Sequence, residues 1–492
     1  MSIKLSYDRR TAGARRSRDR GSRRFAFAAG VGALLTYCLG GVVVAPATAS
    51  VTTHLSQLSG MAACTSPTAG QSCADGVALV GANSATVSPD GRSAYVASGI
   101  SDAVAVFDRA ANGTLTQKAG LAGCISNTGA GPCVDGTALD GASSVTVSPD
   151  GASVYVSSHS SDAVAVFNRS AIGTLTQKPG RQGCISEIEI NSCVTGSALD
   201  GAASVTVSPD GASVYVASQI ASAVAVFDRA LDGSLTQKPD VAGCVSRSWA
   251  GHDCTVGEPL DGAASVTVSP DGTNAYVAST IGVAVLDRAT DGTLTQRRSK
   301  GVCIGSGRLC VGARGLHGAR SVAVSPDARN VYVASAASDA IAVLDRGARG
   351  TLSQKPGTAG CISNTGARPC ADGTALDGAS SVTVSPDGHN AYVAALSGAV
   401  VMFDRAADGS LSQRPGSAGC ISETGVGLCA DGTALGGAAS VTITPDGHNV
   451  YVAAAKSDAV AAFTRFESLG APCPPEICII EDPAGPPPTE SS

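Results

Sequence analysis

The sequence is poor in aromatic and charged residues. Phe, Trp and Tyr make up 4% of its 492 residues and charged residues 15%, with 60 Gly but only one Trp. Ala, Ser, Thr and Val are abundant. This composition disfavours long helices and is typical of short strands joined by tight turns.

Common catalytic motifs are also missing. The chain has no nucleophile elbow, no His-Glu-x-x-His and no phosphate-binding glycine loop. The sequence therefore gives little indication of catalysis, and we expect no cofactor and no metal.

Charge is unevenly distributed along the chain. Nine of the 34 Lys and Arg lie in the first 24 residues, and no charged residue follows until Asp75. Beyond residue 49 the chain has 25 basic and 38 acidic residues, a net charge of −13. Because an acidic protein binds a phosphate backbone poorly, we expect no nucleic-acid partner.

Residues 1–49 have the parts of a secretory signal peptide. A basic region ends at Arg24, an apolar run follows, and Ala47-Thr48-Ala49 suits a cleavage site before Ser50. Both the general and the twin-arginine export routes stay open. The apolar run is long enough to span a bilayer, so an uncleaved N-terminal anchor is the alternative. We expect an exported protein, secreted or at the cell surface.

A repeat dominates the rest of the chain. Ser-Pro-Asp-Gly or a close variant recurs at intervals of 56 to 61 residues, beginning at Ser88, Ser148, Ser208, Ser269, Ser325, Ser385 and Thr444. Each repeat predicts four short strands, for example at 144–148, 154–156, 163–167 and 174–177. Four antiparallel strands per repeat are typical of a propeller blade, so we predict an all-β, seven-bladed β-propeller.

The chain ends predict how the propeller closes. The last repeat has three strands, whereas His54-Leu55-Ser56-Gln57 matches the fourth strand of the other repeats. We therefore expect the N-terminal strand to complete the last blade, which removes exposed sheet edges. The predicted domains are a signal peptide at 1–49, the propeller at 50–466 and a Pro-rich disordered tail at 467–492.

Sixteen of the 17 cysteines fall into local pairs. In an exported protein we expect disulfides, and pairing within each repeat is the economical connectivity. Metal binding is the alternative, but the pairs lack the usual ligand spacing. The expected pairs are Cys64/Cys73, Cys124/Cys133, Cys184/Cys193, Cys244/Cys254, Cys303/Cys310, Cys361/Cys370, Cys420/Cys429 and Cys473/Cys478.

One face of the disc is expected to carry the function. The Ser-Pro-Asp-Gly turns lie on one face, here the turn face, and the second-to-third-strand loops and cystine loops lie on the other, here the loop face. On the loop face, four acidic residues are expected to ring the channel mouth, where they would hold a cation or a polar ligand: Asp140, Asp200, Asp261 and Asp377. The alternative is that Asp-Gly is repeated turn chemistry.

A few residues depart from the repeat. His317 replaces one of these aspartates, and Arg314 and Arg320 flank it, so the three are candidates for acid–base chemistry on a small anion. His159 and Trp249 are candidate ligand contacts on the same face. The alternative is that all five are solvated loop residues.

The repeat resembles a known family. Ser-Pro-Asp-Gly-x3-Tyr-Val-Ala-Ser, Ala-Val-Ala-Val-Phe-Asp-Arg and Asp-Gly-Ser-Leu-Thr-Gln are similar to the lactonase-type seven-bladed propellers, over about residues 54–465. That superfamily includes 6-phosphogluconolactonases, carboxymuconate cyclases and Tyr-Val-Thr-Asn surface-layer repeats. The resemblance implies the fold and suggests lactone chemistry, but its motifs are strand and turn residues.

The expected function is a binding or scaffold module. Because the blades are so alike, most of the disc offers repeated groups, whereas an active site needs different groups at one point. The alternative is a lactone hydrolase or cycloisomerase with its site at the channel mouth. Expected partners are a small polar molecule or a cell-surface component, with no membrane contact beyond an N-terminal anchor, and we expect a monomer.

Overall fold

The computed structural model describes residues 51–67, 72–129, 131–188, 192–247, 253–307, 310–366, 369–425 and 427–469. The predicted leader, Trp249, Cys473 and Cys478 lie outside these ranges. The side chains of 51–52 and 467–469 are also not described. The described residues contain no helix that is long and apolar enough to cross a bilayer.

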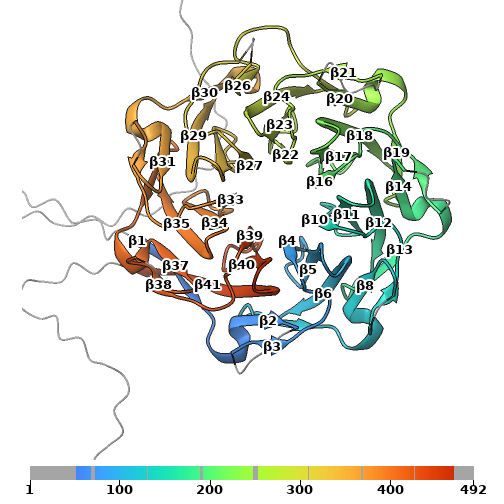
Figure 1. The fold of residues 1–492 in the computed structure, drawn as a ribbon, viewed down its shortest axis with the longest axis horizontal. Helices are drawn as coiled ribbons and strands as arrows, with labels where there is room; N and C mark the ends of the chain where they lie inside the picture. Colours follow the sequence, from blue (N-terminus) through green and yellow to red (C-terminus); the bar gives the residue numbers. More distant parts are fainter. Residues whose placement is uncertain are drawn as a thin grey trace, which may run out of the picture. The chain divides into compact units, whose positions relative to one another are not determined.

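Seven sheets surround a central channel, which confirms the predicted all-β, seven-bladed propeller (Figure 1). The innermost strands of blades 1 to 7 are β4 (Ala82–Val87), β10 (Ala142–Val147), β16 (Ala202–Val207), β22 (Ser265–Val268), β27 (Ala319–Val324), β33 (Ala379–Val384) and β39 (Ala438–Ile443). The second strands are β5 (Ser93–Ser98), β11 (Ser153–Ser158), β17 (Ser213–Ser218), β23 (Asn274–Ser279), β28 (Asn330–Ser335), β34 (Asn390–Ala395) and β40 (Asn449–Ala454). The third strands are β6 (Ala103–Arg109), β12 (Ala163–Arg169), β18 (Ala223–Arg229), β24 (Gly282–Arg288), β29 (Ala340–Arg346), β35 (Ala399–Arg405) and β41 (Ala459–Leu469).

The fourth strand of each blade is longer than the pattern predicts and is split in two. Its first part pairs with the third strand as β7 (Leu115–Gln117), β13 (Leu175–Gln177), β19 (Leu235–Gln237), β25 (Leu294–Thr295), β30 (Leu352–Gln354), β36 (Leu411–Gln413) and β1 (Val51–Gln57). Its second part pairs with the same strand as β8 (Cys124–Ser126), β14 (Cys184–Ser186), β20 (Cys244–Ser246), β26 (Cys303–Gly305), β31 (Cys361–Ser363), β37 (Cys420–Ser422) and β2 (Cys64–Ser66).

Short elements complete the blades. In six blades a 3₁₀ helix separates the two parts of the fourth strand, as η1 (Gly60–Ala63), η2 (Gly120–Gly123), η3 (Gly180–Gly183), η4 (Asp240–Gly243), η6 (Gly357–Gly360) and η7 (Gly416–Ala418), while η5 (Ala348–Gly350) forms a turn in blade 5. A two-residue parallel strand edges six blades as β3 (Ala74–Asp75), β9 (Val134–Asp135), β15 (Val194–Thr195), β21 (Thr255–Val256), β32 (Ala371–Asp372) and β38 (Ala430–Asp431).

Blade 7 contains strands from both ends of the propeller. β1 pairs antiparallel with β41 over seven residues, from Val51↔Leu469 to Gln57↔Phe463, and β2 pairs with the start of β41. The N-terminal segment therefore supplies the outer strand that the last repeat lacks.

The core lies between neighbouring blades. Second strands are buried along their whole length, because both of their faces pack against other blades. In one cluster Tyr95 and Val104 of blade 1 pack against Val154, Ala165 and Phe167 of blade 2. Each blade thus depends on its neighbours for a buried interior.

All seven disulfides predicted within the described residues are present, so the local pairing is confirmed there and these cysteines are not metal ligands. Each closes a loop of 7 to 10 residues between the outer strand of one blade and the connection to the next. The bonds are Cys64–Cys73, Cys124–Cys133, Cys184–Cys193, Cys244–Cys254, Cys303–Cys310, Cys361–Cys370 and Cys420–Cys429. The eighth predicted pair, Cys473/Cys478, stays a prediction. Disulfides of this number are typical of an oxidising compartment.

Candidate functional site

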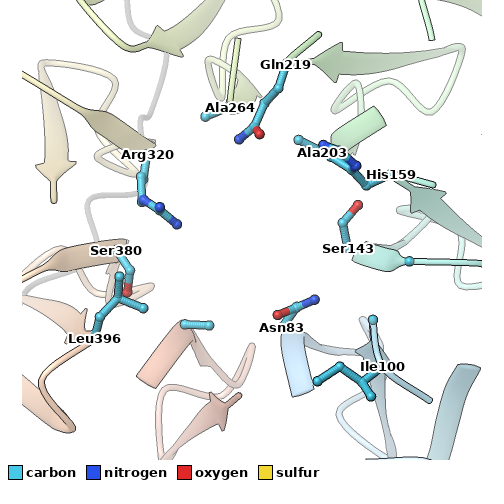
Figure 2. Close-up of a pocket in the computed structure, with 13 residues that line it drawn as sticks. Asn83, Ile100, Ser143, His159, Ala203, Gln219, Ala264, Arg320, Ser380 and Leu396 are labelled. Carbon is cyan, nitrogen blue, oxygen red and sulfur yellow. The ribbon is translucent and has the colours of Figure 1, made fainter. Parts of the chain in front are cut away.

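The channel mouth on the loop face holds a pocket of about 470 Å³ to which all seven blades contribute (Figure 2). One position near the start of each innermost strand lines it, spaced by one repeat: Asn83, Ser143, Ala203, Ala264, Arg320, Ser380 and Ala439. The repeat places these seven residues in a ring.

A β-bulge turns these side chains inward. In blade 2, Ala142 pairs with Ser158 and Ser144 with Ser157, so Ser143 is an extra residue in its strand. The same register shift occurs in blades 1, 3, 5, 6 and 7. Bulges redirect side chains at barrel rims and next to binding sites, and in these six blades they point one residue each into the channel.

The second-to-third-strand loops supply the rest of the pocket. His159 and Gln219 occupy equivalent positions, one residue after β11 and β17, and Leu396 is their counterpart after β34. Figure 2 shows Arg320, Gln219 and His159 projecting from different blades toward the same space. The pocket therefore gathers a guanidinium, an imidazole and an amide, although the blades are so alike.

The hydroxyl groups of the ring are already engaged in holding blades together. Ser143 Oγ donates to the carbonyl of Ala202 in the next blade at 2.7 Å, and Ser380 Oγ donates to the Ala438 carbonyl at 2.8 Å. By contrast, the side chains of His159, Gln219 and Arg320 make no hydrogen bond to another described residue. These three are the groups that can contact a ligand.

Asp200 interacts electrostatically with His159. Burial is the largest cause that raises the pKa of Asp200, and the nearby charges of Asp162 and Glu187 raise it further, while His159 lowers it. Glu187 Oε2 accepts from the N–H of Asp200 at 2.8 Å, which fixes the connection between blades 2 and 3. The imidazole of His159 therefore has a carboxyl group within electrostatic reach.

Comparison with known proteins agrees with this architecture. Residues 77–182 match the family described as "Lactonase, 7-bladed beta-propeller". The predicted resemblance is confirmed. Over these residues the chain resembles a lactonase-type propeller. The matched segment includes Asn83, Ser143 and His159 of the pocket.

Several solved structures are similar to this chain at low sequence identity. A structure described as a 6-phosphogluconolactonase from Bacteroides uniformis is 19% identical, with a TM-score of 0.46 over 67% of this chain and 82% of that chain. The periplasmic gluconolactonase of Pseudomonas aeruginosa is 18% identical, with a TM-score of 0.48 over 73% and 87%. Hydrazine synthase of Kuenenia stuttgartiensis is 18% identical, with a TM-score of 0.49 over 80% and 98%. No curated protein sequence matches this one.

The residues predicted to act with Arg320 are not brought to this pocket. Arg320 and His159 line it, but His317 and Arg314 do not. The backbone N–H and carbonyl of Arg314 bond to the side chain of Gln354 in the outer strand β30, and the His317 N–H donates to Ser338 Oγ. Trp249 lies outside the described residues.

The four aspartates expected to ring the channel mouth do not line the pocket either. Asp140 lies beside Asp102 of the preceding blade, and burial followed by the charge of Asp102 raises its pKa. Asp261 forms an ion pair with Arg247. Asp377 lines a separate pocket on blade 6.

Four other aspartates, each at the end of a second-to-third-strand loop, join neighbouring blades. Each accepts a hydrogen bond at 2.7–2.8 Å from the glycine N–H that begins the next blade, in the pairs Asp102–Gly141, Asp162–Gly201, Asp339–Gly378 and Asp458–Gly81. Within the described ranges, no three His, Cys, Asp or Glu side chains are placed to hold a metal ion.

Sequence reasoning missed Asn83, Ser143 and Gln219 as pocket residues. A signal for them exists in the repeat. The position of Asn83 holds Asn, Ser, Ala, Ala, Arg, Ser and Ala in successive blades, whereas the strand around it barely changes. Variation at one position of a strict repeat marks a surface where the blades have diverged.

Proposed function

We propose that this protein is an exported binding module that takes a small organic anion, such as a carboxylate, at the channel mouth. The observation that carries the proposal is the guanidinium of Arg320, which projects into a pocket whose described lining includes no carboxylate. The seven disulfides support export to an oxidising compartment.

The chemistry around Arg320 suits a carboxylate. A guanidinium presents paired N–H donors that match the two oxygens of a carboxylate, so it gives orientation as well as charge. His159 and Gln219 line other parts of the pocket and offer donors and acceptors to the remainder of a polar ligand. A few convergent polar groups in a preformed pocket are typical of a small-molecule site.

Calorimetric titration of the oxidised protein with a panel of small carboxylates tests the proposal. Arg320→Gln is expected to weaken binding by about tenfold or more, because a charge-assisted hydrogen-bond pair is lost. Arg314→Gln is the matched control: it removes an exposed arginine of the same blade that lies outside the pocket. Equal affinity of the wild type and both variants contradicts the proposal.

A second candidate function is lactone hydrolysis in the same pocket. Two observations favour it: the lactonase family match spans His159, and His159 lies within electrostatic reach of Asp200. In this reaction His159 takes a proton from a water molecule that attacks the lactone carbonyl, and Arg320 stabilises the oxyanion. The ring C–O bond then breaks, the imidazolium returns the proton to the leaving alkoxide, and a hydroxy acid is released.

Proton release from sugar and aromatic lactones, followed at constant pH, tests this candidate. If it holds, His159→Ala lowers the rate by about a hundredfold or more, as expected for loss of a general base. His317→Ala, an exposed histidine outside the pocket, leaves the rate unchanged. Absence of proton release above background from the folded protein leaves binding alone as the function.

A further inference from the structure

Blade 6 differs from its neighbours in the loop between its second and third strands. Three residues, Leu396, Ser397 and Gly398, join β34 to β35, whereas four residues join the same strands in blades 1, 2, 3, 5 and 7. The Ser397 N–H donates to the Asp377 carbonyl, as the equivalent Ser160 N–H donates to Asp140 in blade 2. The Gly398 carbonyl accepts from the Glu423 N–H, as the Asp162 carbonyl accepts from the Glu187 N–H in blade 2. The residue between them is therefore the one that is missing.

In four blades the missing residue is a serine with a defined role. Its hydroxyl accepts a hydrogen bond at 2.9–3.1 Å from the N–H of the residue that precedes the blade's first glycine. The pairs are Ser101 with Val80, Ser161 with Asp140, Ser338 with His317 and Ser457 with Gly436. In blade 6 the equivalent donor is the Asp377 N–H, which has no partner among the described residues.

A pocket of about 230 Å³ lies beside Asp377 in blade 6. Its lining includes Asp377, Ser397, Thr374, Thr424 and Asn364, drawn from the shortened loop, the connection from blade 5 and the cystine loop. It shares no lining residue with the channel-mouth pocket. The volume has room for a molecule of about the size of one sugar ring.

The groups around Asp377 in the blade 6 pocket favour a ligand with a hydroxyl group at this point. The Asp377 N–H has no partner among the described residues, and an ammonium group or metal cation beside it has no lone pair to accept from it and leaves it unpaired. The Asp377 side chain also belongs to a residue that lines the pocket and forms no ion pair with any described residue, so its negative charge disfavours an anion. A hydroxyl accepts from the N–H and donates to the carboxylate, as the serine hydroxyl accepts in the sister blades.

The remaining walls suit further hydroxyl groups. Ser397, Thr374 and Thr424 carry hydroxyls that both donate and accept. The Asn364 side-chain oxygen is taken by the Leu376 N–H at 3.1 Å, which leaves its amide hydrogens for a ligand. We propose that the blade 6 pocket binds a neutral, hydroxyl-rich molecule of monosaccharide size, such as the terminal sugar of a glycan.

Titration of the full-length oxidised protein with D-glucose, D-galactose and D-mannose, followed by saturation-transfer NMR and calorimetry, tests this site. Saturable binding of at least one sugar is expected. Asp377→Ala is expected to weaken it by about tenfold, because the carboxylate acceptor is lost. Asp140→Ala, at the equivalent position of blade 2 where Ser161 Oγ accepts from the backbone N–H, leaves binding unchanged.

A second variant tests the origin of the pocket. A serine inserted between Ser397 and Gly398 rebuilds the sister loop, fills the pocket and is expected to abolish sugar binding without loss of folding. Arg320→Gln, in the channel-mouth pocket, is expected to leave sugar binding unchanged, which separates this site from the proposed anion site. Failure of all three sugars to bind, or binding that survives the insertion, overturns the proposal.

Discussion

At the residue scale, an arginine at the end of each third strand joins neighbouring blades. In blade 3, Arg229 Nε donates to Tyr155 Oη of blade 2 at 2.8 Å, and its Nη2 pairs with Asp150 at 2.7 Å. Tyr155 Oη donates in turn to the carbonyl of Gly233 at 2.8 Å. The arginine–tyrosine bond recurs at six of the seven blade junctions.

The seventh junction lacks part of this network. Neither Tyr392 Oη nor Arg465 Nε has a hydrogen-bond partner among the described residues, although both residues are buried. Closure of the ring explains the missing partner of Tyr392 Oη: β1 supplies the outer strand of blade 7, so this blade has no third-to-fourth turn to offer a glycine carbonyl.

This difference gives a matched pair of tyrosine substitutions. Tyr155→Phe is expected to lower the free energy of unfolding by about 1–2 kcal/mol, because Arg229 Nε and the Gly233 carbonyl lose their partner. Tyr392→Phe removes a hydroxyl with no partner and is expected to be neutral or slightly stabilising. Urea unfolding of the three proteins measures both effects, and equal losses in the two variants contradict the network described above.

Residues of the site were only partly predictable. His159 and Arg320 could be predicted because they depart from the repeat in chemical type. The four aspartates do not line this pocket, because a leucine-aspartate-glycine string predicts a turn but not the direction of the carboxyl group. Asn83 and Ser143 were missed because the bulge that turns them inward has no signature in the alternation of the strand.

At the element scale, the repeat predicts most of what is seen. Strands such as β10 to β13 lie where alternation and turn residues place them, because each strand is set by local pattern and by packing against a near-identical neighbour. The second part of the fourth strand was not predicted. The Cys-Ile-Ser segments follow a proline-rich or glycine-rich turn and are too short to show alternation, yet pairing with the third strand orders them.

The consequence of the shortened blade 6 loop is visible only in the structure. One missing residue between Ala395 and Ala399 does not change the strand pattern, so alignment of the repeats alone does not show that a hydroxyl partner is lost. The hydrogen bonds of the equivalent serines in blades 1, 2, 5 and 7 show which interaction blade 6 has lost.

At the scale of the whole molecule, the ring of arginine–aspartate pairs predicts sensitivity to acid. Burial alone would raise the pKa of Asp90, but hydrogen bonds from Ser88, the Arg92 N–H and Arg169 outweigh it and lower the pKa to about 2. The pKa of Asp271, Asp327 and Asp446 is lowered to about 2 for similar reasons. Folding therefore favours the ionised form of each.

The stability from these aspartates depends on pH in a defined direction. It is fully present above the unfolded-state value of 3.8 and is lost as pH falls toward 2. The raised pKa values of Asp140 and Asp200 change stability with pH in the opposite direction, but these are two aspartates against the four whose pKa is lowered to about 2. Urea unfolding followed by circular dichroism is expected to show constant stability from pH 7 to about 5 and a steep fall between about 4 and 2. Unchanged stability across the lower range contradicts this account.

The central claim is that the channel mouth, where all seven blades meet, binds a small organic anion through Arg320. Crystals soaked with a bromine-labelled benzoate, with anomalous diffraction recorded at the bromine edge, test it most directly. We predict one bromine position inside the ring of first strands, with the carboxylate on the Arg320 guanidinium. A bromine found only elsewhere on the disc, or no ordered bromine at concentrations that saturate binding in solution, would contradict the claim.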